Sequence, residues 1–254
     1  MIVRIPKVVT DKAAVILFVL AWELSARLEL VNNLFIPPLS KVLATVWHLL
    51  ISDMFLQHIL ISLARSMGGF AVAVIVAIPL GLIMGGWFHK LELALEPLFA
   101  IAAQANPFIL FHVIILFLGI GEATKVTIIA WICIWPILFN TMNGVRHVDT
   151  TLLKAAMSFG LKRWKIFWKI ILPAAAPSIF TGLRLSAGYS FFLLIAAEMM
   201  GSSSGLGWFV LYSQENFNIQ WIFAGAVVIA LLGLAIDALL AFIEKRLIVW
   251  RQAG

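Results

Sequence analysis

The chain has 254 residues, of which 63% are hydrophobic and only 12% are charged, and its formal net charge is +6. Because soluble domains carry about 25% charged residues, this composition excludes a soluble domain. Repeated apolar runs approach the ~20 residues that cross a bilayer, which predicts an all-α integral membrane protein forming a single transmembrane domain over residues 1–254. With Cys133 as its single cysteine, the chain cannot form an internal disulfide framework or a cysteine metal cluster.

The basic residues gather on one predicted side of the membrane. Lys41, in a loop on the opposite side, is the clear exception. This positive-inside pattern predicts that both termini are cytoplasmic. Membrane topology therefore accounts for the positive charge, and no nucleic-acid partner is expected. The basic residues assigned to the inner side are thirteen of the eighteen: Arg4, Lys7, Lys12, Lys90, Arg146, Lys154, Lys162, Arg163, Lys165, Lys169, Lys245, Arg246 and Arg251.

The chain begins with a short basic segment, residues 1–12, which we expect to be a cytoplasmic tail. Residues 13–30 form the first predicted span. Glu23 and Arg27 lie four residues apart in it, a spacing at which the two can pair and so lower their cost in the membrane. Residues 39–50 follow as a short helix with one apolar face, expected to lie along the outer interface.

The second predicted span, residues 59–86, is rich in small residues. It includes a GxxxG step at Gly81 and Gly85, which permits close packing of a neighbouring helix. The fourth predicted span, residues 124–143, returns the chain to the cytoplasmic side.

The third predicted span, residues 93–118, is interrupted by Gln104-Ala105-Asn106-Pro107. Polar residues and proline at membrane depth are costly in lipid and are tolerated where they face protein or a wet cavity. His112 lies further along the same span. It is either a hydrogen-bonded packing residue or, with Gln104 and Asn106, part of a cavity lining.

Residues 145–173 form a predicted cytoplasmic loop that is too polar for lipid. Two alanines at 155–156 favour a helix, and Gly160 is a natural stop for it. A second helical pattern follows, with Trp164 and later apolar residues at three- and four-residue spacing. Pro173 marks where a new helix can begin. The alternative is an amphipathic helix resting on anionic headgroups.

Residues 178–200 and 221–243 complete a set of six predicted spans, and the glycine- and serine-rich segment 201–207 between them is expected to be flexible. Residues 208–212 are expected to fold back toward the membrane. The fifth span carries two ionisable residues and the sixth carries Asp237. We find no internal repeat, so an inverted-repeat transporter has no support.

Each ionisable residue in the last two spans has a functional and a structural interpretation. Glu198 either touches substrate or gates the outer mouth, or it is a helix-end carboxylate satisfied by a neighbour; intramembrane charge favours the first. Asp237 lies near the inner interface, where a structural ion pair with Arg or Lys is the preferred interpretation. Arg184 either pairs with Asp237 or attracts an anion.

The spacing of the cytoplasmic loop resembles the EAA loop of ABC-importer permeases. The two alanines, Gly160, Ile170 and Leu172-Pro173 stand at the family's intervals, and Lys154 replaces the usual leading Glu. Further segments are similar to those of the nitrate/sulfonate/taurine/bicarbonate permease branch. The middle of span three departs from that branch, because only Pro107 remains of its proline-rich run. The similar segments are Asn140–Arg146, Thr181–Arg184, Ala197–Met199, Ser203–Gly207, Phe223–Gly225 and the ending with Asp237 and Glu244–Arg246.

This resemblance implies a type I ABC importer permease fold, with six transmembrane helices and a cytoplasmic coupling helix between spans four and five. It implies ABC ATPase subunits, a second copy of the chain and a periplasmic or lipoprotein solute-binding protein as partners, in a bacterial cytoplasmic membrane. ATP and Mg would bind the ATPase subunits, since this chain has no GxxxxGK[ST] loop. The implied substrate is a small anion or organic molecule.

Two sets of residues are expected to carry this function. The first set contacts the ATPase, and the second lines the translocation path. Two other classes of protein stay open: a membrane enzyme using Glu198, Asp237 or His112, and a membrane scaffold without transport. The expected ATPase contacts are Lys154, Ala155, Ala156, Phe159, Gly160, Lys162 and Trp164. The expected path residues are Gln104, Asn106, His112, Glu198 and Met199.

Overall fold

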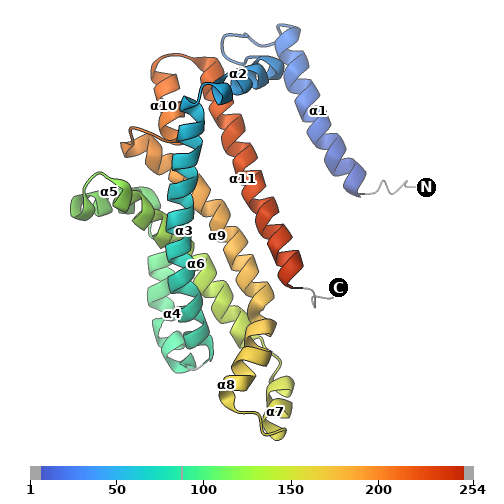
Figure 1. Ribbon diagram of the computed structural model, residues 1–254, viewed down its shortest axis with the longest axis vertical. Coiled ribbons are helices and arrows are strands. Elements are labelled where there is room, and N and C mark those ends of the chain that lie inside the picture. Colours follow the sequence, from blue (N-terminus) through green and yellow to red (C-terminus); the bar gives the residue numbers. More distant parts are fainter. Residues whose placement is uncertain (1–6, 87, 249–254) are drawn as a thin grey trace.

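The computed structural model describes residues 7–86 and 88–248, and every regular element in these ranges is a helix (Figure 1). The all-helical fold expected from composition is confirmed. The elements are α1 (Lys7–Arg27), α2 (Leu39–Ile51), α3 (Met54–Gly86), α4 (His89–Ala103), α5 (Pro107–Leu118), α6 (Glu122–Arg146), α7 (Thr150–Ser158), α8 (Arg163–Ile166), the π-helical turn η1 (Phe167–Ile171), α9 (Leu172–Gly201), α10 (Leu206–Glu215) and α11 (Ile219–Leu247).

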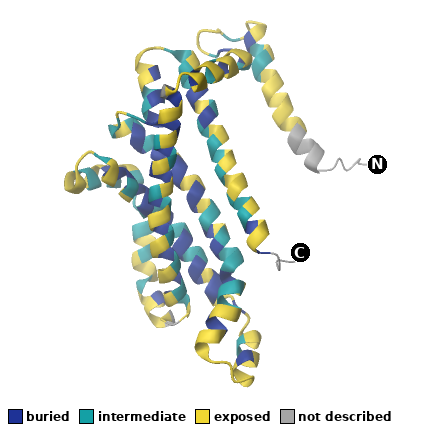
Figure 2. Cartoon of the chain, viewed as in Figure 1, coloured by how far each residue is buried: buried dark blue, intermediate teal, exposed yellow. Residues whose placement is uncertain are grey.

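Three long helices, α3, α6 and α9, pack against one another and carry most of the buried residues (Figure 2). Glycines allow this close approach. A Cβ atom added to Gly81 would lie 2.7 Å from the Cβ atom of Thr141, and one added to Gly85 would lie 3.1 Å from the carbonyl oxygen of Met142. The predicted GxxxG step is therefore a packing surface between α3 and α6.

Four described helical segments are long and apolar enough to cross a membrane: Phe55–Gly86, Glu122–Arg146, Arg163–Gly201 and Ile219–Leu247. The pair α4 and α5 would supply a fifth. Helix α1 is not among them, so the predicted first span, and with it the count of six, stays a prediction. Residues 1–6 of the expected tail lie outside the described residues, and α1 already begins at Lys7, inside that tail.

The predicted third span is not straight. Helices α4 and α5 are bent by 91° at the segment between them, so α5 runs sideways from the bundle (Figure 1). The local chemistry explains the break. The side chain of Asn106 accepts hydrogen bonds from the backbone N–H groups of Phe108 and Ile109, and Pro107 occupies the first position of α5. An N-cap followed by proline starts a new helix in a new direction.

The helix expected to begin at Pro173 is α9, which starts at Leu172 with Pro173 in its first turn. The chain is helical from Arg163 through Gly201, with the π-helical turn η1 directly before Leu172 and Pro173. Proline lacks an N–H to donate and crowds the carbonyl of the preceding turn. The wider π turn accommodates both effects, so the helix continues through the proline.

The two ends of the bundle differ. Helices α7 and α8 project from one end, and α2 and α10 lie at the other (Figure 1). Helix α2 confirms the short helix expected over 39–50. Residues 208–212, expected to fold back toward the membrane, lie within α10, and their placement against the membrane stays a prediction. The loop 145–173 and the segment 201–207 are thus at opposite ends, as the order of the predicted spans requires.

Candidate functional site

The projecting end is built on a tight turn at Gly160. Helix α7 starts with the side chain of Asp149 accepting a hydrogen bond from the backbone N–H of Thr151 at 2.7 Å. Gly160 has a φ of +72°, and its N–H donates to the carbonyl of Met157, while that of Leu161 donates to the carbonyl of Ala156. These two bonds form a Schellman motif, which satisfies the last carbonyls of α7 and turns the chain sharply.

This turn presents large apolar side chains to the outside. Phe159 is 85% exposed, Trp164 65% and Met157 57%. Exposed apolar side chains grouped in this way mark an interaction surface when they are not facing lipid. Ala156 is buried on the inner side of α7, and the other residues expected to contact the ATPase are exposed. They lie on α7, in the turn or on α8: Lys154, Ala155, Phe159, Gly160, Lys162 and Trp164.

At the opposite end, a buried ion pair joins α3 to α9. The Arg65 Nη1 atom lies 2.7 Å from the Glu198 Oε1 atom, and their side chains are 6% and 0% exposed. The same guanidinium donates two hydrogen bonds of 2.6 Å to the carboxylate of Glu122, at the start of α6. Arg65 therefore connects three helices, and both carboxylates share its charge.

The segment expected to be flexible is held by this cluster. The backbone N–H groups of Gly205, Leu206 and Gly207 donate to His58 Nδ1, Ser62 Oγ and Glu198 Oε2, at 3.0, 2.8 and 2.9 Å. Side chains thus satisfy three successive backbone donors at the start of α10, where a helix leaves its N–H groups unpaired. The expectation of flexibility was wrong because these partners come from α3 and α9, which the local composition does not show.

Sequence reasoning missed Arg65, although an arginine inside an apolar span is a signal for function or pairing. Glu198 was identified, and its carboxylate is occupied by Arg65, Ser62 and a backbone N–H. This geometry favours the structural interpretation of Glu198. Met199, the next residue, is half-buried.

A second ion pair joins α9 to α11 nearer the projecting end. The Arg184 Nη2 atom lies 3.0 Å from Asp237 Oδ1, and Arg184 Nη1 lies 3.4 Å from Glu244 Oε2. The expectation that Asp237 pairs with a basic residue is confirmed. A cavity of about 300 Å³ lies beside these side chains, lined also by Thr181 and Leu185.

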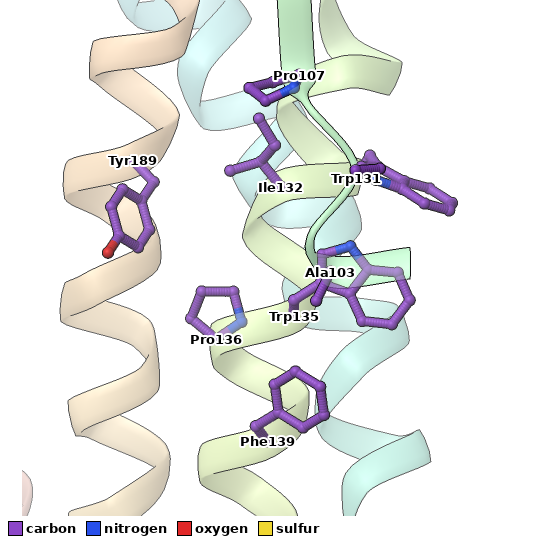
Figure 3. A pocket seen from close by; sticks show the side chains of 9 residues that line it. Ala103, Pro107, Trp131, Ile132, Trp135, Pro136, Phe139 and Tyr189 are labelled. Atoms are coloured by element: carbon purple, nitrogen blue, oxygen red, sulfur yellow. The ribbon is translucent and has the colours of Figure 1, made fainter. Parts of the chain in front are cut away.

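The break between α4 and α5 borders a larger cavity of about 350 Å³ (Figure 3). Its walls come from the break, from α6 and from Tyr189 of α9. Three residues expected in the translocation path lie near this cavity. Gln104 and Asn106 are neighbours in sequence of residues that line it. His112 lies more than one turn into α5, with its Nδ1 atom 2.7 Å from the carbonyl oxygen of Phe108. All three side chains are exposed in the single chain. The lining residues are Ala103, Ala105, Pro107, Trp131, Ile132, Trp135, Pro136, Phe139 and Tyr189.

The residues of the enzyme alternative do not come together. Glu198 is held by Arg65, Asp237 by Arg184, and His112 by its own helix, and these three places lie on different helices. General acid–base chemistry requires such groups to converge on one substrate. The chain is thus a long helical bundle with an exposed turn at one end and a bent pair of helices at its middle (Figure 1).

Comparison with known proteins agrees. Residues 77–249 match the family described as the binding-protein-dependent transport system inner membrane component, and the chain belongs to this family. It is the transmembrane permease subunit of an ABC importer, of the nitrate, sulfonate and taurine branch suggested by the sequence.

Among its relatives, a putative ABC transporter permease of Methanocaldococcus jannaschii is 34% identical and covers 93% of this chain and 90% of its own length. The taurine transport system permease protein TauC of Escherichia coli is 31% identical over 90% of this chain and 85% of its own. The MetNI methionine ABC transporter, solved in inward-facing conformations, has a chain with a TM-score of 0.67 at 17% identity, covering 78% of this chain and 96% of that one. This last likeness confirms the type I importer fold.

Proposed function

We propose that two copies of this chain form the translocation pathway of an importer that is driven by two separate ATPase subunits. ATP and Mg bind those subunits, and this chain holds no cofactor of its own. A solute-binding protein delivers a small anion or small organic molecule at the outer end. The exposed turn at Gly160 carries this proposal, because no described element of the chain covers its apolar side chains.

The coupling segment, the expected loop 145–173, is the part that the ATPase grips. Phe159 and Trp164 are more than half exposed. Phe159 caps the end of α7 and Trp164 lies on α8, on either side of the turn that the Schellman motif fixes. The continuous helix Arg163–Gly201 begins inside this segment and reaches the opposite end of the bundle. A movement imposed on the segment by a closing ATPase dimer is therefore passed on as rigid-body motion of a packed helix.

The Arg65–Glu198 pair lies at the other end of that helix. Glu198 belongs to α9, whose first residues lie at the end of the coupling segment, and its partner Arg65 belongs to α3. If α9 moves relative to α3, either the side chains of Arg65 and Glu198 must adjust to keep the ion pair or the ion pair must break. Four residues remain those that we propose to line the translocation path: Gln104, Asn106, His112 and Met199. Glu198, whose carboxylate is held by neighbours, is proposed to act on the path through its pair with Arg65.

The proposed orientation places the coupling segment and both termini in the cytoplasm of a bacterial cell, with the protein as a multi-pass component of the cytoplasmic membrane. The basic residues of the 154–169 stretch support this orientation through the positive-inside rule. Helices α2 and α10 then lie at the outer face, where the binding protein docks.

Co-purification with the ATPase tests this proposal. The chain is expressed together with a candidate ABC ATPase subunit from the same genome, and the complex is isolated in detergent through a tag on the permease. We expect a complex with two copies of each subunit. Failure of the wild-type chain to retain the ATPase, with the chain itself folded by circular dichroism, would overturn the proposal.

A further inference from the structure

The coupling segment, residues 145–173, carries a positive charge that the rest of the chain does not neutralise. It holds six lysine and arginine residues and one acidic residue, Asp149, which gives a net charge of +5. The Asp149 side chain is engaged, since it accepts a hydrogen bond from the backbone N–H of Thr151. All six basic side chains are exposed, and within the described part of the chain no ion pair involves any of them. They are Arg146, Lys154, Lys162, Arg163, Lys165 and Lys169.

Membrane topology explains only part of this charge. The positive-inside rule counts lysine and arginine, whereas aspartate and glutamate contribute little to it. The rule therefore does not require a segment in which the basic residues lack acidic partners. Helices α7 and α8 also lie beyond the ends that α4 and α11 have on this side of the bundle (Figure 1). Because the attraction of anionic headgroups falls off within a Debye length of the membrane surface, a partner that covers the far tip is the better match for these charges.

The charges alternate with the exposed apolar side chains of the tip. Lys154 lies three residues before Met157 on α7, so the two share a face of that helix. Arg163 directly precedes Trp164 at the start of α8. A protein that covers Met157, Phe159 and Trp164 must also take these two charges out of water. Such burial is favourable only where opposite charges meet, and a basic residue facing Lys154 or Arg163 would be repelled.

A cavity within the segment also suits an acidic partner. Its volume is about 250 Å³, and its walls come from α7, from α8 and η1, and from Gly86 at the end of α3. Arg163 is the only charged residue among the described residues that line it. A carboxylate that enters the cavity would meet this guanidinium, which binds carboxylates through two parallel hydrogen bonds.

We infer that Lys154 and Arg163 select the ATPase, because they fit a cleft that has carboxylates at the positions facing them. The inference rests on the proposed import function and deepens it by naming the charge of the partner surface. Lys154 stands where the family's loop usually begins with Glu. A cleft that carries a basic group to match such a Glu would repel Lys154. The chain is therefore matched to an ATPase with an acidic cleft and discriminates against ATPases whose cleft is basic at this point.

Carbodiimide crosslinking tests the contact itself. This reagent joins a lysine amine to a carboxylate that touches it, forming an amide while the carbodiimide takes up the water as a urea. The complex of the chain with an ABC ATPase subunit from the same genome is treated in phosphatidylcholine nanodiscs, and mass spectrometry locates the linked residues. We expect Lys154 to be joined to an aspartate or glutamate of the ATPase.

Affinity measurements test the selection. The Kd of the ATPase for the chain in nanodiscs is measured by biolayer interferometry at low and high sodium chloride. We expect the wild-type affinity to fall as salt rises, because added ions screen exposed charges. Lys154→Glu is expected to weaken the affinity about tenfold at low salt. Lys245→Glu, the same change at an exposed position near the end of α11, is the matched control and should bind like the wild type.

An exchange of charges covers the case of a poorly folded variant. The ATPase carboxylate that is linked to Lys154 is replaced by lysine, which is expected to weaken binding to the wild-type chain and to restore binding to Lys154→Glu. The inference is overturned if Lys154→Glu binds as the wild type does, if the exchange restores nothing, or if Lys154 is joined to no acidic residue of a bound ATPase. It is also overturned if salt weakens binding only in nanodiscs that contain phosphatidylglycerol, because the charges would then serve anionic headgroups.

Failure of this inference is distinguishable from failure of the proposed function. A complex whose affinity responds neither to salt nor to Lys154→Glu contradicts the acidic cleft and leaves the import function standing. A folded chain that retains no ATPase at any salt concentration contradicts the import function, and the inference with it.

Discussion

Arg65 and Glu198 are 133 positions apart in the chain, and their side chains form a 2.7 Å ion pair with almost no exposed surface. Arg65 is also paired with Glu122, whose side chain is 63% exposed. One guanidinium thus holds a fully buried carboxylate and a largely exposed one. The two pairs are expected to differ widely in their contribution to stability, because removing one partner of a buried pair leaves an uncompensated charge.

Replacing the buried carboxylate tests this difference. We expect Glu198→Leu to lower the free energy of unfolding by about 3–5 kcal/mol, because Arg65 would keep only a solvent-facing partner. Glu122→Gln is the matched control and should cost about 1 kcal/mol or less. Thermal unfolding in detergent, followed by circular dichroism, measures both. Equal losses from the two variants would show that Arg65 does not depend on its buried partner.

Two neighbouring glycines of α3 offer a test of helix packing. A Cβ atom at Gly69 would lie 2.5 Å from Ile129 Cγ2 and 3.0 Å from the carbonyl of Val126, whereas one at Gly68 meets only a side-chain methyl at 3.8 Å. We expect Gly69→Ala to destabilise the chain by about 1–3 kcal/mol through overpacking against α6. Gly68→Ala should be neutral or stabilising, since alanine favours a helix by about 1 kcal/mol. The same melting measurement separates them, and a destabilised Gly68→Ala would contradict the packing of α3 on α6.

The turn at Gly160 is expected to need a residue that tolerates a positive φ, whereas the volume of the side chain there should not matter. Its φ is +72° and a Cβ atom there would meet nothing within 4 Å. Gly160→Val is expected to strain the turn by about 1–2 kcal/mol and to weaken ATPase retention, while the bundle melts as before. Gly160→Asn, a residue that tolerates this conformation, should retain the ATPase. Retention is measured as the amount of ATPase that co-purifies with each variant. Equal retention by the two variants would show that the conformation at Gly160 is not needed for ATPase binding.

Local signals in the sequence were sufficient for some of these features. The stop at Gly160 follows from one residue that tolerates positive φ, and the break before α5 follows from Asn106 and Pro107. Both depend on a few adjacent residues. The branch of the family was also recognisable from short segments, because a motif and the interval to the next motif can be read directly from the sequence.

Features that depend on distant partners could not be predicted in the same way. The 91° bend at the break reflects how α5 packs on α6, and the continuation of the helix through Pro173 reflects the π turn before it. Two of the partners that hold segment 201–207, His58 and Ser62, lie more than a hundred residues earlier, on α3. Propensity and spacing describe neighbours along the chain and carry no information on these contacts.

Crosslinking from the exposed turn tests the coupling role most directly. The single cysteine, Cys133, is fully buried, so Phe159→Cys adds one accessible thiol at the projecting end, and Tyr212→Cys adds one at the opposite end. Membranes containing the ATPase are treated with benzophenone-4-maleimide, whose maleimide reacts with the introduced thiol, and are then irradiated so that the benzophenone inserts into C–H bonds of the protein that lies against it. We expect a permease–ATPase crosslink from Phe159→Cys and none from Tyr212→Cys. A crosslink from Tyr212→Cys alone, or none from Phe159→Cys in a complex that still co-purifies, would contradict the assignment of residues 145–173 as the segment that the ATPase grips.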